Sequence, residues 1–170
     1  KKFAQKAKNL KELAFGKKNK FMHSDIGYNY RMTNLQAALG CAQMVKINSI
    51  ISKKIQIAKL YEKYLKKNNM IKLPLTKKNV KNVYWMYCIT IPSFNSSKTE
   101  KLMKKLLKKG IETRKMFIPY NLQKFGSKQK KYNCPKANKV AFNTFYLPSG
   151  VDLNNRDIKY ISDCLTKIIS

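Results

Sequence analysis

The run Gly27–Gly40 constrains the fold more than any other stretch, because it joins a polar, aromatic-rich loop to the start of a helix. Gly27–Met32 holds two tyrosines, an asparagine and an arginine, with no apolar period. Thr33–Gln36 then fits a capping box, in which Thr33 caps the helix and Gln36 reaches back to it. The free N–H groups and the positive dipole of such a helix end suit an anion.

One long amphipathic helix is predicted after this cap, because apolar residues recur at helical spacing from residue 34 to residue 67. A straight helix of that length would span about 50 Å, more than a small core needs, so a bend is expected near Asn48–Ser49. Gly40 lies inside the helix, where glycine costs about 1 kcal/mol relative to alanine. Close packing against another backbone is the expected reason for it.

The rest of the chain alternates short strands with helices, which predicts an α+β domain. Strands are expected at residues 83–91, 111–118 and 145–147. Helices are expected at 2–13, from Ser97 or Thr99 to Gly110, at 134–142, and from Asn154 or Asn155 to the C-terminal end. The aromatic cluster at 84–87 is interpreted as sheet core rather than as a platform for nucleotide stacking.

The chain has 170 residues, of which 44% are hydrophobic, enough for one domain or for one domain and a fragment of another. It begins at Lys1 and its first methionine is Met22, so we expect a partial chain. Neither a secretory segment nor an apolar run long enough to span a membrane is visible, so no membrane partner is expected.

The formal net charge is +29, a value that raises the question of nucleic-acid binding. All but three of the 37 basic residues are lysine, and the arginines are Arg31, Arg114 and Arg156. Proteins that read base edges favour arginine, and the lysines here are spread along the chain as on solvated helix faces. We therefore expect no specific nucleic-acid partner, only loose binding of polyanions at low salt.

The four cysteines, Cys41, Cys88, Cys134 and Cys164, lie too far apart in the sequence for a zinc or redox motif. We expect them to be reduced and partly buried, which fits a cytoplasmic protein. His23 is the single histidine, which argues against a histidine-based metal site or a Ser–His triad, and no metal is expected.

The run Gly27–Gly40 resembles the signature of the DegT/DnrJ/EryC1/StrS family of sugar aminotransferases. Val83–Tyr87, Gly110–Arg114 and Leu147–Gly150 are also similar to family segments, and they follow in the same order. The resemblance covers nearly the whole chain but only the C-terminal part of a family member. It is greatest to perosamine-synthetase-like members, which act on a GDP-linked 4-keto-6-deoxy sugar.

The resemblance implies pyridoxal 5'-phosphate (PLP) as cofactor and the fold type I architecture of aspartate aminotransferase. Residues 1–33 would be the tail of the large PLP-binding domain, 34–67 the long interdomain helix, and 68–170 the small C-terminal α+β domain with a short antiparallel three-stranded sheet. The family's covalent lysine and its acid against the pyridine nitrogen both lie upstream. No catalytic residue is therefore assigned here, and the chain alone is expected to be inactive.

Two candidate residues come from the signature loop and its approach. In the family, the asparagine at the position of Asn29 reaches across a homodimer to the PLP phosphate of the partner subunit. The alternative is an asparagine that holds a turn through its own backbone. His23 lies where the family often has a histidine and is expected to line the sugar pocket, the alternative being a hydrogen-bonded structural histidine.

Three further residues are expected to bind substrate. Arg31 could anchor a phosphate or carboxylate, or form an ion pair at the helix entrance. Arg114 could do the same, or form a salt bridge to Glu112 or Asp25. Asn121 replaces a histidine that is common in the family; it can hydrogen-bond but cannot carry a proton at neutral pH, so the accepted sugar could differ.

The interpretation is the C-terminal segment of a PLP-dependent aminotransferase. It would transfer an amino group from a donor such as glutamate to a nucleotide-linked keto sugar for surface polysaccharide. The active site would be shared between the subunits of a homodimer. The alternative is a catalytically inactive, basic small domain that acts as a binding or dimerisation module.

Overall fold

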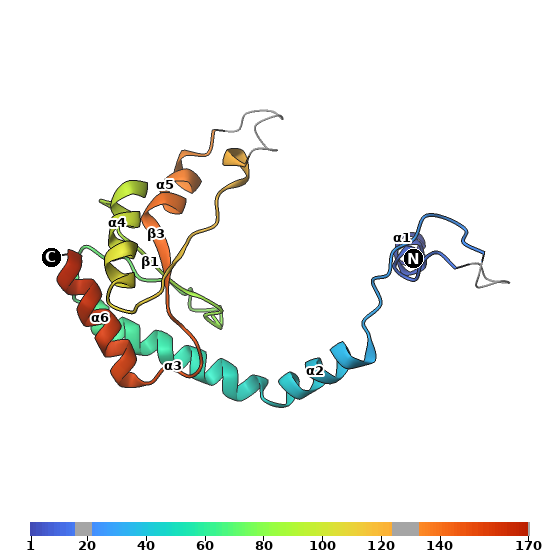
Figure 1. Ribbon diagram of the computed structural model, residues 1–170, viewed down its shortest axis with the longest axis horizontal. Helices are drawn as coiled ribbons and strands as arrows, with labels where there is room; N and C mark the ends of the chain where they lie inside the picture. Colours follow the sequence, from blue (N-terminus) through green and yellow to red (C-terminus); the bar gives the residue numbers. More distant parts are fainter. Residues whose placement is uncertain (16–21, 124–132, 170) are drawn as a thin grey trace. The chain divides into compact units, whose positions relative to one another are not determined.

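The computed structural model describes residues 1–15, 22–123 and 133–169, which form two compact units, Lys1–Ile47 and Asn48–Ser170. Unit 1 contains α1 (Lys2–Lys11) and α2 (Asn34–Val45) (Figure 1). Unit 2 contains most of α3 (Ile47–Leu65), followed by β1 (Tyr87–Thr90), α4 (Ser96–Leu107), β2 (Arg114–Lys115), the 3-10 turn η1 (Tyr120–Leu122), α5 (Pro135–Asn143), β3 (Thr144–Leu147) and α6 (Asn155–Ile169).

The three strands form one antiparallel sheet, as the family resemblance implied, and their order is β1-β3-β2. Tyr87 pairs with Leu147 at one end of β1, and Arg114 pairs with Tyr146 across β2 and β3. The expected α+β class is therefore confirmed. β3 is the central strand because it pairs with both others, although it comes last in the sequence.

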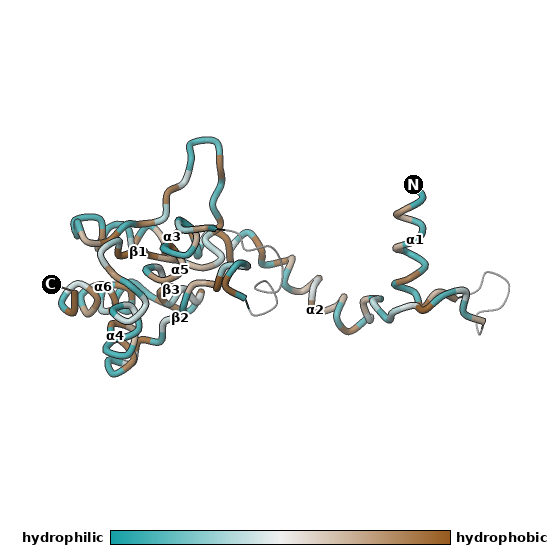
Figure 2. Tube along the Cα trace, turned by 90° about the horizontal axis from the view of Figure 1, so that it is seen from above, coloured by the Kyte–Doolittle hydropathy of each residue, from teal (hydrophilic) through white to brown (hydrophobic). Residues whose placement is uncertain are grey.

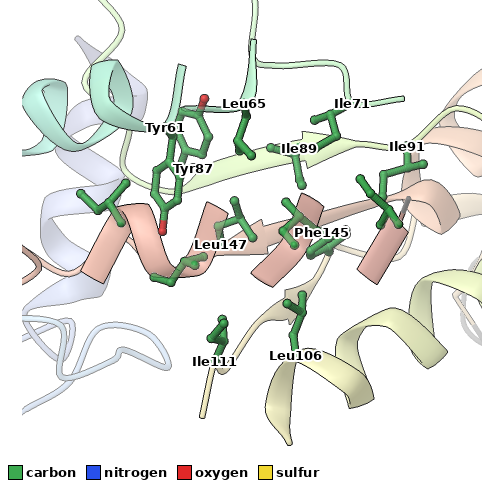
Figure 3. Packing of buried hydrophobic residues seen from close by; sticks show 14 of the residues in the cluster. Tyr61, Leu65, Ile71, Tyr87, Ile89, Ile91, Leu106, Ile111, Phe145 and Leu147 are labelled. Carbon is green, nitrogen blue, oxygen red and sulfur yellow. The ribbon is translucent and has the colours of Figure 1, made fainter. Parts of the chain in front are cut away.

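One face of the sheet is covered by α3, α4 and α6, and the core lies between them (Figure 3). Ile89 of β1 and Phe145 of β3 are fully buried there. The periodicity of the last helix predicted this packing, because α6 turns Ile158, Ile161 and Leu165 into the same cluster.

The predicted long helix is present but divided, since α2 ends at Val45 and α3 begins at Ile47. Lys46 has φ −100° and ψ 1°, and its N–H turns back to Gln43 and Met44, so the break precedes the expected bend at Asn48–Ser49. Hydrophobic positions recur along α2 (Figure 2). Among the described residues no atom lies within 4 Å of a Cβ built on Gly40, so the close packing expected for this glycine is not found there.

β1 is shorter than predicted because the chain turns before it. Tyr84 has a positive φ of 49°, and its N–H donates to Asn82 Oδ1 at 2.9 Å. Trp85 follows this turn and is 69% exposed, so its assignment to the sheet core was wrong. Tyr87, two positions on, is buried as expected.

β2 is also shorter than the predicted strand at 111–118, since only Arg114 and Lys115 pair with β3. Phe117 and Ile118 are exposed. The cap of α4 is Asn95, which accepts from Lys98 N, rather than Ser97 or Thr99.

Within the described ranges, no helix is both long and apolar enough to cross a bilayer, and no group of side chains has the make-up of a metal site. Cys88, Cys134 and Cys164 are free and half-buried, as expected, whereas Cys41 is exposed.

Two stacked core tyrosines are expected to respond oppositely to loss of the hydroxyl. The rings of Tyr61 and Tyr87 lie 4.8 Å apart at 18°, and burial raises the pKa of both phenols. Tyr61 donates to Pro148 O at 2.7 Å, whereas the buried hydroxyl of Tyr87 has no partner among the described residues. Tyr61→Phe should lower the free energy of unfolding by about 1 kcal/mol, and Tyr87→Phe should leave it unchanged or raise it by a similar amount. Urea unfolding of both variants checks this; equal losses would contradict it.

Candidate functional site

The signature loop lies against the end of α1 in unit 1. Tyr28 N donates to Leu10 O at 2.6 Å, and Leu13 N donates to Tyr28 O at 3.2 Å. Leu13 and Ala14 turn the chain with positive φ values of 66° and 50°. A Cβ on Gly27 would overlap the backbone of Leu13 and Ala14, so only glycine fits at this contact.

Asn29 lies in an extended stretch of this loop, opposite Glu12. The rings of Tyr28 and Tyr30 stack with centroids 5.4 Å apart and an interplanar angle of 6°. Side chains alternate along an extended chain, so Asn29 projects away from that stack. Its exposed amide has no hydrogen bond within the described ranges, so the turn-holding role considered for it is not seen.

His23 is fixed by the turn that follows α1. Its Nδ1 lies 2.6 Å from Leu13 O and, because a carbonyl only accepts, Nδ1 carries the proton. Its ring also lies 5.2 Å from that of Phe15. This geometry favours the structural interpretation of His23, while Nε2 remains available as an acceptor on the exposed side.

The N-terminus of α2 has the predicted capping box. Gln36 N donates to Thr33 Oγ1 at 3.3 Å, and Thr33 N donates to Gln36 Oε1 at 2.8 Å. The first turn contains no acidic side chain that would offset the positive end of the helix. Arg31 is exposed just before the cap and forms no ion pair with the described residues, so this end of unit 1 suits an anion.

Unit 2 contains a cavity of about 650 Å³ between α3, the sheet and the start of α6. The residues that line it include Arg114, Glu112, Trp85 and Tyr146. Burial raises the pKa of the Tyr146 hydroxyl. The cavity has two cationic and three acidic side chains, so it can receive a ligand that carries both signs of charge.

The loop at one side of the cavity is held by α3. Lys54 Nζ donates to Ser149 O at 2.6 Å and to Ser149 Oγ at 3.1 Å, and burial lowers the pKa of this lysine. Further along the same helix, Tyr64 donates to Asn155 Oδ1 at 2.7 Å. These contacts fix Ser149 and the first turn of α6 against α3.

The five predicted site residues divide between the two units. His23, Asn29 and Arg31 lie together in unit 1. Arg114 lines the cavity of unit 2, whereas Asn121 is half-buried in η1, outside the set of lining residues. The salt bridge considered for Arg114 is not formed among the described residues.

Three cavity residues were missed by the sequence analysis. Trp85 was placed in the core, and no sequence signal distinguishes it, because the left-handed turn at Tyr84 that places it at the cavity is visible only in the structure. Lys54 carries no signal, because it is one of many lysines at helical spacing. Glu112 was considered only as a salt-bridge partner of Arg114.

Comparison with known proteins decides the family. Residues 1–166 match the model of the DegT/DnrJ/EryC1/StrS aminotransferase family. The chain belongs to this family. GDP-perosamine synthase of Escherichia coli O157:H7 is 34% identical over 151 residues, which cover 88% of this chain and 40% of that protein. The chain thus spans well under half of that relative's length.

Solved structures of aminotransferases have the same fold as this chain. PseC of Helicobacter pylori, an aminotransferase of pseudoaminic acid biosynthesis, matches with a TM-score of 0.86 at 22% identity over 98% of this chain and 46% of its own. Spr1654 of Streptococcus pneumoniae, solved in its PLP form, matches with a TM-score of 0.87 at 18% identity over 98% of this chain and 43% of its own. The aspartate-aminotransferase-like fold is therefore confirmed, and PLP is the cofactor of the family.

The side chains of unit 1 fit part of such a cofactor. The amide of Asn29 and the guanidinium of Arg31, which have no partner within the part of the chain that the structure describes, and the N-terminus of α2 are donors that suit a phosphate. The half-buried Lys54 of unit 2 is engaged by Ser149.

Proposed function

We propose that the chain is the C-terminal segment of a PLP-dependent aminotransferase that aminates a nucleotide-linked keto sugar, with a 4-keto-6-deoxy sugar as acceptor. An amino acid such as glutamate is the donor. The enzyme acts in the cytoplasm, and its product is used for the synthesis of surface polysaccharide. The observation that carries the proposal is the signature loop, held against α1 by backbone hydrogen bonds with Asn29 free beside the capped end of α2.

In this proposal the enzyme is a homodimer in which Asn29 donates to the PLP phosphate bound by the partner subunit. An amide suits this task because it donates two N–H groups and adds no charge. When bound, the cofactor supplies the electron sink for amino transfer, and its covalent lysine lies upstream of Lys1. In this proposal the chain binds and orients the cofactor and the substrates, and it contributes no catalytic residue of its own.

The substrate-binding residues in the proposal are His23, Arg31, Arg114 and Asn121. Arg31 and Arg114 have no side-chain partner among the described residues, and they suit the phosphates or carboxylates of the substrates. His23 offers only Nε2, because Leu13 O occupies Nδ1. At Asn121 an amide stands where a histidine is common in the family. We expect this difference to change which sugar the enzyme prefers.

The complete enzyme is expected to transfer heavy nitrogen from labelled L-glutamate to a GDP-linked 4-keto-6-deoxy sugar in a PLP-dependent manner. Mass spectrometry of the sugar product measures the transfer, and the 170-residue chain alone serves as the inactive control. Absence of transfer to GDP- and UDP-linked keto sugars by a PLP-loaded enzyme would contradict the proposal. Amination by the 170-residue chain alone would contradict the upstream position of the covalent lysine.

A further inference from the structure

We propose that the loop at residues 74–83, which precedes β1 in unit 2, binds the surface of a lipid bilayer that contains anionic headgroups. Its lysines would pair with the headgroups, and its aliphatic side chains would enter the boundary between headgroups and acyl chains. The inference goes beyond the proposed amination and does not depend on it. The expectation of no membrane partner rested on the lack of a spanning segment, and binding to a bilayer surface needs none.

The shape of this loop is the first observation. It projects away from the sheet and the helices of unit 2 (Figure 2). At its base, Thr76 Oγ1 lies 3.3 Å from Tyr84 OH, and the amide of Asn82 donates to Thr76 Oγ1 at 3.3 Å. Across its tip, Val80 N donates to Lys77 O at 3.0 Å. The loop is therefore already ordered, and a partner would not have to offset the cost of ordering it.

The exposed aliphatic side chains of the loop are the second observation. Leu75 is 99% exposed, and Val80 and Val83 are 53% and 43% exposed. Isolated apolar residues are normal on a protein surface, but three on one short projecting loop indicate an interaction site. The loop contains neither arginine nor an aromatic residue, the side chains that favour binding of nucleic acid.

The charge of the loop is the third observation. Lys77, Lys78 and Lys81 are all exposed, and their side chains form no ion pair among the described residues. The nearest acidic residues in the sequence are Glu62 and Glu100, and every charged residue between these two is a lysine. An anionic surface would therefore meet only positive side chains on the loop.

The combination of lysines with aliphatic side chains selects the kind of partner. Exposed lysines alone attract any polyanion, and α4 has such lysines as well. An anionic bilayer also offers an apolar layer directly beneath its charged headgroups, which suits Leu75 and Val80. A nucleic acid has no such layer for aliphatic side chains, so the bilayer fits both features of the loop.

Sedimentation with lipid vesicles tests the proposal directly. At physiological salt the 170-residue chain should bind vesicles of phosphatidylcholine in which about a third of the lipid is phosphatidylglycerol. Vesicles of phosphatidylcholine alone should bind about 100-fold more weakly, because the lysines then lose their anionic partners.

Two variants of the loop separate the charged from the apolar contact. The first variant removes the three positive charges of the loop, by Lys77→Gln, Lys78→Gln and Lys81→Gln. It should weaken binding to the anionic vesicles about 100-fold. The second variant, Leu75→Ser with Val80→Ser, keeps the charge unchanged and should weaken this binding about tenfold, because the apolar contact is lost.

A matched control removes the same charge from outside the loop. It replaces three exposed lysines of α4, by Lys98→Gln, Lys101→Gln and Lys105→Gln. Because these lysines lie outside the proposed contact, the control should weaken vesicle binding by less than about threefold. Circular dichroism verifies that each variant is folded.

Five results would overturn the proposal. The first three are no binding of the folded chain to anionic vesicles, a control that weakens binding as much as the loop lysine variant does, and a serine variant that binds as tightly as the unmodified chain. In the fourth, single-stranded poly(U) binds more tightly than the vesicles at the same salt, and the loop lysines are needed for it. In the fifth, the chain sediments as a dimer that the serine variant dissociates, so that a second copy covers the loop.

Discussion

Asn29→Asp is expected to lower the affinity of the complete enzyme for PLP by roughly 5- to 150-fold. The substitution keeps the shape of the side chain but places a negative charge against the phosphate. At a partly buried contact this repulsion is worth about 1–3 kcal/mol. Asn29→Ala should cost less, because it removes hydrogen bonding without adding repulsion.

Absorbance titration of the apoenzyme with PLP measures these affinities. Asn69→Asp provides the matched control, because Asn69 is exposed and the same charge is added away from the signature loop. If Asn29→Asp and Asn29→Ala both bind PLP as tightly as the unmodified enzyme, Asn29 does not hold the phosphate.

Gly27→Ala is expected to detach the signature loop from the end of α1. The new Cβ would overlap the backbone of Leu13 and Ala14, which cannot move aside as a flexible side chain could. Overpacking of this kind costs about 3 kcal/mol. Amide exchange of Ser24 and Tyr28, whose N–H groups donate to Ala14 O and Leu10 O, should accelerate on the order of 100-fold.

Gly40→Ala is the contrasting substitution, because Gly40 lies inside α2 with nothing within 4 Å of its Cβ position among the described residues. It should stabilise α2 by about 1 kcal/mol through helix propensity.

Unchanged amide exchange of Ser24 and Tyr28 in Gly27→Ala would show that the signature loop is not held by the contact of Gly27 with Leu13 and Ala14.

Local chemistry predicted part of the candidate site. Thr33 and Gln36 lie three residues apart, and their hydrogen bonds follow from that spacing alone. The apolar period of α6 likewise predicted its buried face. The antiparallel sheet was predicted from the family resemblance, and the order of its strands was not predicted, since the pairing of β1 with β3 joins residues far apart in the chain.

The remainder depends on contacts that no local pattern encodes. Nothing near Gly27 in the sequence indicates that the backbone of Leu13 lies against it. Tryptophan is common in strands, but the left-handed turn at Tyr84 places Trp85 at the cavity instead. The engagement of Lys54 by Ser149 links residues on α3 and after β3, which only the folded unit brings together.

The most direct test of the signature loop is the activity of a mixed dimer. One subunit carries Asn29→Asp, and the other carries a substitution of the covalent lysine. If Asn29 serves the partner's cofactor, one site has both groups intact, so about half of the normal activity should remain. If Asn29 instead serves its own subunit, each site carries a lesion, and activity well below half would contradict the shared site.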